Sequence, residues 1–233
     1  MSVLKLPGLL DLVRITRGSR LETEKAFRAY YASKPPFNYN TARSVTRGFY
    51  SGDLSLAQGL HACHQRGSPI GRPFNAQVVE AIFPVTTERN VLCFDVPGQL
   101  FSVRADMHFW VRPLCGFSEN RIPYLLFLQP RKLFDLTHVQ LGMLASIIKL
   151  SLIRDDFSGA NIELLDVSCR DGELKRSCDI YRLEDLPILA EEELHAEFEK
   201  FANAYDRLIE GGLGDRDTTR PDENPENQMP LIW

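Results

Sequence analysis

The sequence predicts an α/β protein in which a mixed central β-sheet is flanked by helices. Three observations predict this class. The stretch from 100 to 152 contains two apolar strand-like segments followed by an amphipathic helix. Further helical and strand-like segments lie on both sides of it, as in α/β folds. The apolar share of 44% and the charged share of 25% are those of a globular protein, so 233 residues suit one α/β domain with extensions.

Composition divides the chain into three regions. Residues 1–74 predict a basic, helical N-terminal extension, residues 75–210 the α/β core, and residues 211–233 a polar, disordered tail. The tail ends in the apolar residues 229–233, a segment suited to dock on the body of the protein or on a protein partner.

The first helices are expected within the basic region. A short helix is predicted over residues 9–15. A second is predicted over residues 22–32, where glutamates stand at the front and basic residues follow, as the helix dipole prefers. Two prolines end it at residues 35–36, and the segment 41–49 that follows is polar and basic.

Two more helices are expected before the sheet. Asp53 is placed to cap a helix over residues 54–65, which carries part of an apolar stripe. Asn75 is placed to cap a helix over residues 76–83, and Pro84 is expected to stop it.

Strand-like segments follow. Residues 90–96 and 100–111 predict a hairpin through the Pro97-Gly98 turn, with Asp106 at the middle of the second strand. Residues 113–120 predict a loop. The remaining elements are a strand over 122–132, a helix over 136–152, strands over 161–168 and 178–183 joined by a tight turn at 170–172, and a helix over 191–209. Three leading glutamates suit the start of the last helix, and Gly211 is expected to end it.

Charge is distributed unevenly along the chain. Residues 1–75 hold 11 Lys and Arg against 4 Asp and Glu, whereas the remainder holds 16 against 27. Arginines in the basic region are interleaved with aromatic residues, a combination that can bind phosphates and stack on bases: Arg43, Arg47, Arg66 and Arg72 with Phe37, Tyr39, Phe49 and Tyr50. We therefore expect a nucleic-acid groove here. The alternative is a solvated charged surface over helices whose aromatic residues belong to the core.

Cysteine usage and hydropathy indicate the compartment. The five cysteines are odd in number and irregularly spaced, which favours reduced thiols over a disulfide framework. No apolar run approaches the ~20 residues that a membrane helix needs. We expect a cytoplasmic protein without a membrane segment or a secretory signal.

Four short motifs follow one another along the core. They are Glu80 within Val78-Val-Glu-Ala81, Asp106 within Val103-Arg-Ala-Asp106, the strand end Gln129-Pro-Arg-Lys132, and Gln140-Leu141 in the helix that follows. Their order is similar to that of the PD-(D/E)XK nuclease superfamily, and most to its Cas4/RecB-like branch. In that family a helix glutamate precedes a hairpin, an aspartate lies on the second strand, an acidic-x-Lys motif ends the third strand, and the next helix often carries a Gln-Leu pair. The resemblance covers residues 75–183.

The resemblance implies a restriction-endonuclease-like fold and metal-dependent hydrolysis of phosphodiester bonds in DNA or RNA. Glu80 and Asp106 would bind Mg²⁺ or Mn²⁺, hard cations that prefer oxygen ligands. Asp106, Gln129 and Lys132 would be the catalytic residues, because the metal lowers the pKa of an attacking water and the lysine stabilises the developing charge. Gln140 would be a further contact to nucleic acid.

One feature departs from the family pattern. Gln129 stands where the family has an acidic residue, and it is three residues from Lys132 rather than two. A neutral amide is a poorer Mg²⁺ ligand than a carboxylate. Two functions therefore remain open: a variant nuclease, or a catalytically inactive nuclease-fold protein that serves as a nucleic-acid-binding or protein-interaction adaptor. The motif residues also have structural interpretations, with Glu80, Asp106 and Lys132 facing solvent and Gln140 capping a helix or bonding a loop.

Overall fold

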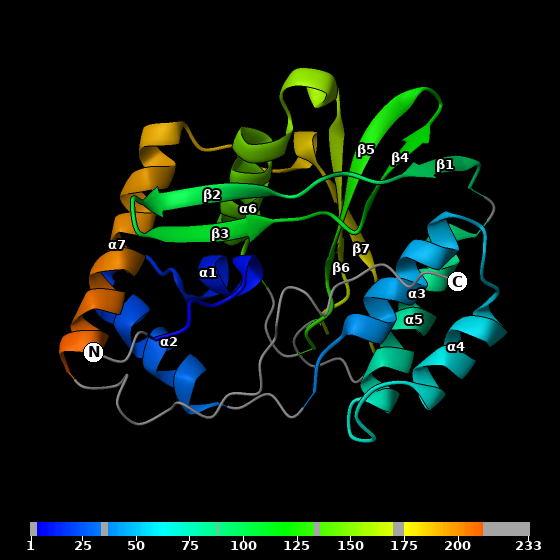
Figure 1. The fold of residues 1–233 in the computed structure, drawn as a ribbon, viewed down its shortest axis with the longest axis horizontal. Coiled ribbons are helices and arrows are strands. Elements are labelled where there is room, and N and C mark those ends of the chain that lie inside the picture. The colour runs from blue at the N-terminus through cyan, green and yellow to red at the C-terminus, as the bar shows by residue number, and fades with distance from the viewer. Residues whose placement is uncertain (1–3, 34–36, 88, 133–135, 170–174, 212–233) are drawn as a thin grey trace.

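A mixed five-stranded β-sheet lies at the centre of the structure (Figure 1), which is a computed structural model that describes residues 4–33, 37–87, 89–132, 136–169 and 175–211. Its strands are β1 (Val91–Phe94), β4 (Cys115–Glu119), β5 (Ile122–Gln129), β6 (Asn161–Asp166) and β7 (Asp179–Arg182), in that order across the sheet. Strands β5 and β6 are parallel, and the other neighbouring strands are antiparallel. The predicted α/β class with a mixed sheet is confirmed.

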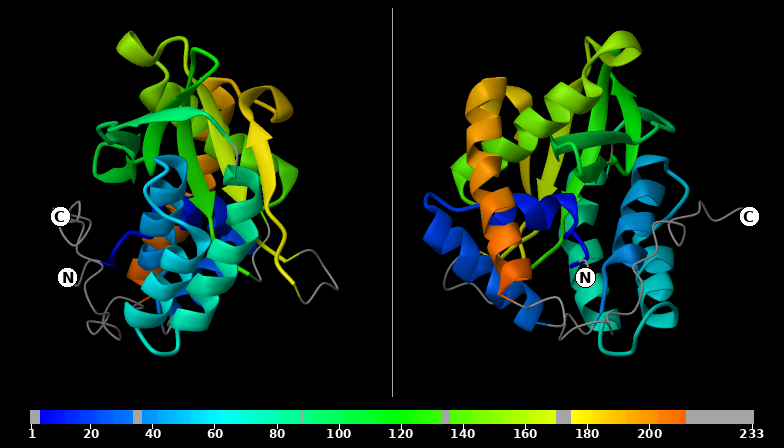
Figure 2. Two further views of the ribbon diagram at one scale, coloured as in Figure 1. Left: turned by 90° about the vertical axis from the view of Figure 1, so that its right-hand side faces the viewer. Right: turned by 60° about the vertical axis from the view of Figure 1, so that its left-hand side comes forward.

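Helices cover both faces of this sheet. One group consists of α1 (Leu9–Ile15), α2 (Arg20–Ala32), α6 (His138–Leu152) and α7 (Glu191–Glu210). The other consists of α3 (Asn40–Tyr50), α4 (Leu56–Gln65) and α5 (Arg72–Thr86). Figure 2 shows the two groups on opposite sides of the sheet. Short 3-10 turns at Asp155–Phe157 and Leu183–Asp185 complete the described elements.

Two hydrophobic cores result from the alternation of side chains along the central strands. Leu125 of β5 and Leu164 of β6 pack with α1, α2, α6 and α7 in what we call the α6-side core. Their neighbours Leu126 and Leu165 point the other way and pack with α3, α4 and α5 in the α5-side core. Because both of its faces are covered, β5 is apolar almost throughout, whereas β6 also carries the buried Glu163 and ends in Asp166.

A separate hairpin is formed by β2 (Gln99–Arg104) and β3 (Met107–Val111). The predicted pairing of residues 90–96 with 100–111 is therefore wrong, since β1 pairs with β4. Residues 105 and 106 form a turn, which keeps the side-chain alternation in phase, so that Phe101 and Phe109 lie opposite each other on the buried face. The alternation of one long strand and that of this hairpin look the same in the sequence.

The predicted loop over residues 113–120 is also wrong, because it contains β4. Cys115 and Phe117 of this strand are buried in the α5-side core. A two-residue turn at Asn120 and Arg121, both with positive φ, connects β4 to β5. Such turns match the twist of a hairpin.

The helices begin at other residues than the caps chosen from the sequence. Ser55, not Asp53, caps α4, and its hydroxyl accepts a hydrogen bond from the Gln58 backbone N–H. Helix α5 begins at Arg72 with a proline in its first turn, which needs no N–H there. It therefore contains both Asn75 and Pro84, and the expected boundary between residues 74 and 75 falls inside it.

One segment described in the sequence only as polar and basic is helical in the structure, and two predicted features fall outside the described residues. The polar segment 41–49 is helical, as part of α3. The turn at 170–172 and the tail beyond residue 211 lie outside the described residues. In the part of the chain that the structure describes, no helix is both long and apolar enough to cross a membrane.

Candidate functional site

Polar side chains gather where the parallel strands β5 and β6 end. Gln129 is the register partner of Asp166, which is in turn the partner of Asp179 on β7. Directly opposed residues point to the same face, and here it is the face of the α6-side core. The carboxyl ends of parallel strands are the usual place for ligands in α/β sheets. We call this group, together with Arg131 and Lys132, the polar edge.

Helix α1 contributes a buried ion pair to the polar edge. The Asp11 carboxylate forms ion pairs with Arg14 and with Arg131, each at 2.7 Å. Both Asp11 and Arg14 are buried. Burial lowers the pKa of the Arg14 guanidinium, and the positive charge of Arg131 lowers it further, against the effect of Asp11.

Arg176 closes the polar edge on its other side. This side chain is 7% exposed, and its Nη1 donates to the carbonyls of Pro130 and Val167, both at 2.7 Å. Nη2 donates to the Tyr39 hydroxyl at 3.1 Å, and the guanidinium lies 5.7 Å from the centre of that ring. Among the described residues its buried Nε has no hydrogen-bond partner. Arg176 thus joins the strand ends to the segment that precedes α3.

Three of the four arginines expected to bind nucleic acid lie on neighbouring helix ends. Arg43 lies in the first turn of α3, Arg66 is the C-cap of α4, and Arg72 is the first residue of α5, where it donates to the Gln65 carbonyl at 3.3 Å. Tyr39, the contact of Arg176, is the N-cap of α3. The contact of Tyr39 with Arg176 thus connects the helix ends on the α5 side to the polar edge, whose strand residues point to the opposite face of the sheet.

Arg47 lies farther along α3. Its Nη2 forms an ion pair with Asp95, just after β1, at 2.6 Å. Arg47 therefore lies at the other end of α3 from Arg43 and is separate from the other three arginines expected to bind nucleic acid.

The two expected metal ligands are not brought together. Glu80 is an exposed residue of α5. Asp106 lies in the turn of the β2–β3 hairpin, where it forms an ion pair with Arg104 at 2.7 Å. The same guanidinium donates two hydrogen bonds to the carboxylate of Asp206 in α7. Figure 1 places this hairpin turn and helix α5 toward opposite ends of the molecule. Among the described residues no three His, Cys, Asp or Glu side chains form a metal-binding group.

The remaining motif residues have clear local contacts. Gln129 is buried, and its side chain bonds the backbone N–H and carbonyl of Arg131, which shapes the chain as it leaves β5. Lys132 is half-buried, and its backbone carbonyl accepts a hydrogen bond from the backbone N–H of Cys169. Gln140 is buried, and its Nε2 lies 3.1–3.2 Å from the carbonyls of Val13, Arg14 and Thr16 at the end of α1. The structural interpretation of Gln140 as a helix cap is therefore the one that the contacts favour.

Sequence reasoning missed several members of the polar edge. Asp166 and Gln129 each end an apolar strand, so the position of Asp166 after Ile162-Glu-Leu-Leu165 was a usable signal. Asp11 and Arg176 gave no such signal, because their contacts with Arg131 and Pro130 join residues far apart in the chain.

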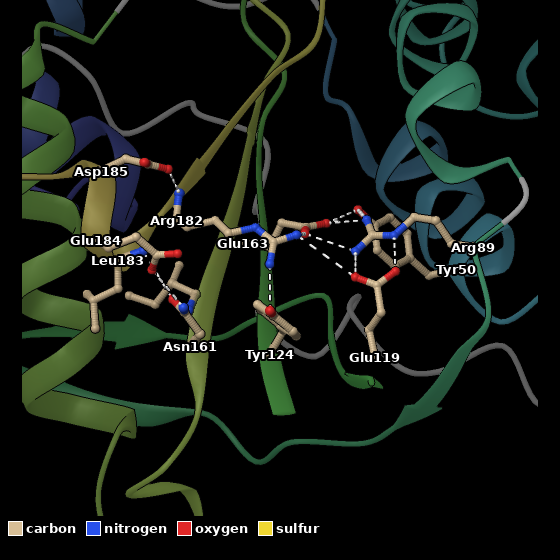
Figure 3. Close-up of polar contacts among 11 residues, drawn as sticks. Tyr50, Arg89, Glu119, Tyr124, Asn161, Glu163, Arg182, Leu183, Glu184 and Asp185 are labelled. Carbon is tan, nitrogen blue, oxygen red and sulfur yellow. Dashed lines mark hydrogen bonds and ion pairs between the residues drawn. The ribbon is translucent and has the colours of Figure 1, made fainter. Parts of the chain in front are cut away.

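A second polar cluster lies away from this edge, between the sheet and α3 (Figure 3). Glu163 of β6 is fully buried and binds Arg89 at 2.6 Å and Arg182 at 3.0 Å, while the Tyr50 hydroxyl donates to it. Glu119 binds Arg89 at 2.8 Å, and the pKa of its carboxyl is lowered by this hydrogen bond. Two arginines face two glutamates, so the cluster is neutral as a whole. Its geometry favours a structural role over ligand binding.

Comparison with protein-family models, with curated proteins and with solved structures gives no match to this chain.

Proposed function

We propose that this chain is a non-catalytic nucleic-acid-binding protein built on a nuclease-like α/β core, with the polar edge and the neighbouring helix ends as its binding surface. The observation that carries the proposal is the character of the polar edge. Arg131, Lys132 and Arg176 lie there beside a neutral Gln129 and the carboxylates of Asp11, Asp166 and Asp179, whereas Glu80 and Asp106 are exposed elsewhere.

The order of elements supports the nuclease-like part of the proposal. Helix α5 precedes the sheet, β5 is the third strand of that sheet, and the Gln129-Pro-Arg-Lys132 segment follows directly at its end. Helix α6, which carries Gln140-Leu141, then connects β5 to its parallel neighbour β6. This is the order in which the nuclease superfamily carries its motifs. Asp106 departs from it, since it lies in an inserted hairpin outside the sheet.

Charge supports the binding part. Lys132 is half-buried at the polar edge. Lys175, next to Arg176 in the chain, is exposed, and so is Arg66 at the end of α4. A surface of this kind neutralises phosphates and releases their counterions, so that binding weakens steeply as salt rises. The aromatic ring of Tyr39, beside Arg176, adds a surface on which a base can stack.

A salt titration tests the proposal. Fluorescence anisotropy of labelled single- and double-stranded DNA and RNA should show binding whose affinity falls linearly with salt on a double-logarithmic plot. Lys132→Ala should reduce the steepness of that line by about one unit and weaken binding to all sequences similarly. Lys149→Ala is the matched control, because this exposed lysine lies in the last turn of α6. Binding that is absent at low salt, or equal losses in both variants, would contradict the proposal.

The same preparations distinguish the nuclease alternative. We expect no cleavage of these nucleic acids with Mg²⁺ or Mn²⁺, because the two expected metal ligands, Glu80 and Asp106, lie on different elements and do not converge. Metal-dependent cleavage that is lost in Asp106→Ala and kept in Glu199→Gln, a change at another exposed acidic residue, would establish the active nuclease instead.

A further inference from the structure

Two cysteines meet on the outer pair of strands in the central sheet. Cys93 of β1 lies directly opposite Phe117 of β4, and Cys115 lies two residues before Phe117 in the same strand. Residues two apart in a strand share a face, so both thiols point into the α5-side core. They are diagonal neighbours across the strand pair, and the interaction between their side chains lowers the pKa of Cys93 and raises that of Cys115.

The two thiols differ in exposure. Cys115 is buried at 1% exposure, whereas Cys93 is half-buried on β1, which lies at one end of the described five-stranded sheet. An attacking molecule therefore reaches Cys93 first. Diagonal positions in an antiparallel pair are about 7–8 Å apart, so a bond between the two sulfurs needs the strands to approach each other. Strand β1 is four residues long and is bonded within that sheet to β4 alone, so it is held on one side only.

The electrostatic surroundings favour the thiolate form at Cys93. The interaction with the Cys115 side chain lowers the pKa of Cys93, burial opposes this effect, and the Arg47 guanidinium lowers the pKa further. Asp53 raises it, and Asp95 partly neutralises Arg47 through their 2.6 Å ion pair. The net direction is downward. A thiolate rather than a thiol is the reacting species in cysteine chemistry.

Cys63 and Cys178 have a raised pKa, the opposite of Cys93. Burial raises the pKa of Cys63 to about 11 and that of Cys178 to about 12. Cys169 is buried as well. Reactive cysteines are typically accessible, have a lowered pKa and lie next to a resolving thiol, and Cys93 combines these three properties.

We propose that Cys93 and Cys115 form a peroxide-sensitive pair, in which Cys93 is the nucleophile and Cys115 resolves the oxidised sulfur. The Cys93 thiolate attacks one oxygen of a hydroperoxide, the O–O bond breaks, and the other oxygen leaves as an alcohol or as water after taking up a proton. Cys93 is then a sulfenic acid. The Cys115 thiol attacks that sulfur, the S–O bond breaks, and its hydroxide leaves as water with the Cys115 proton. The peroxide is reduced by two electrons and the pair becomes a disulfide.

The test uses the full reduced chain and stoichiometric hydrogen peroxide. Peptide mapping without reductant should find a Cys93–Cys115 disulfide, with two of the five thiols lost and both restored by dithiothreitol. Cys115→Ser should instead trap the sulfenic acid, seen as a dimedone adduct at Cys93. Cys93→Ser should give neither product. Cys178→Ser is the matched control and should behave as the unchanged protein.

A second measurement separates reactivity from folding. Alkylation of each cysteine by iodoacetamide should show a lower pH midpoint for Cys93 than for Cys63 or Cys178 in the unchanged chain. Arg47→Met should slow alkylation of Cys93 several-fold at pH 7 and leave the other cysteines unaffected. A dimedone adduct or disulfide centred on another cysteine, or equal alkylation of all five thiols, overturns the proposal.

Discussion

At the scale of single residues, the strongest requirement on this fold is the buried carboxylate of Glu163. It has no exposed surface, and its oxygens are bonded by Arg89, Arg182 and Tyr50. An ion inside a protein loses its hydration, so it is retained only when it is paired and hydrogen-bonded. Removing the charge leaves two arginines facing Glu119 alone.

Glu163→Gln keeps the shape of this side chain and removes its charge. We expect the free energy of unfolding to fall by about 3 kcal/mol, as for other broken buried ion pairs. Glu199→Gln, an exposed change on α7, should shift it by less than about 0.5 kcal/mol. Urea unfolding followed by circular dichroism measures both. Equal, small effects would mean that solvent reaches the cluster.

The neighbouring Glu119 predicts a pH dependence. Its folded-state pKa is lowered from the ordinary 4.5, first by the hydrogen bond from Arg89, so it adds stability above that value. This contribution is lost as pH falls through the folded-state pKa. Unfolding measured from pH 7 to pH 3 should therefore show Glu119→Gln less stable than the unchanged chain at neutral pH, with the difference shrinking below about pH 4.5. If the difference in stability between the two chains stays constant from pH 7 to pH 3, the Glu119 carboxylate is not the source of the pH dependence.

At the scale of elements, turns decide what the apolar pattern leaves open. The sequence locates α1 at residues 9–15 and α6 to within two residues of its start. The amphipathic character expected of α6 is wrong, because residues 140–148 are buried on every side of this helix, as in a helix that is apolar all round. The sequence pattern misses the β2–β3 hairpin, whose turn keeps the alternation in phase. The polar edge is predicted in part: Gln129 and Lys132 follow a visible strand end, but the contact of Arg131 with Asp11 spans 120 residues and leaves no local trace.

The β4–β5 turn gives an element-scale prediction. Arg121 has a φ of 67°, a conformation that costs an L-residue with a side chain roughly 1–2 kcal/mol. Arg121→Gly removes that cost and adds some unfolded-state entropy, so we expect a gain of about 0.5 kcal/mol in thermal or urea unfolding. Asn120→Gly is the control at a φ of 52°, where asparagine is already tolerated, and it should change little. A loss of stability in Arg121→Gly would show that the arginine side chain contributes contacts of its own.

At the scale of the whole molecule, the N-terminal helices are part of the two cores. Leu12 of α1 and Phe27 of α2 are fully buried in the α6-side core, and Phe27 lies 4.7 Å from the ring of Phe201 in α7. Val45 of α3 is buried in the α5-side core. Each core thus combines segments from both sides of residue 75, and Gln140 ties the end of α1 to α6. This arrangement argues against an N-terminal region that folds apart from the sheet.

A truncation tests that conclusion. A chain of residues 75–233 lacks α1 to α4 and the start of α5, which leaves apolar surface of both cores in water, at roughly 25 cal/mol for each Å² exposed. We expect this chain to lose cooperative unfolding or to aggregate. Domains are usually stable by only about 5–15 kcal/mol, and the exposure of apolar surface from both cores removes stability on that scale. A chain that ends at Gly211 keeps every described element and should unfold in one cooperative transition. If the 75–233 chain instead unfolds cooperatively in calorimetry, the sheet is an independent domain and the helices before it are an attachment.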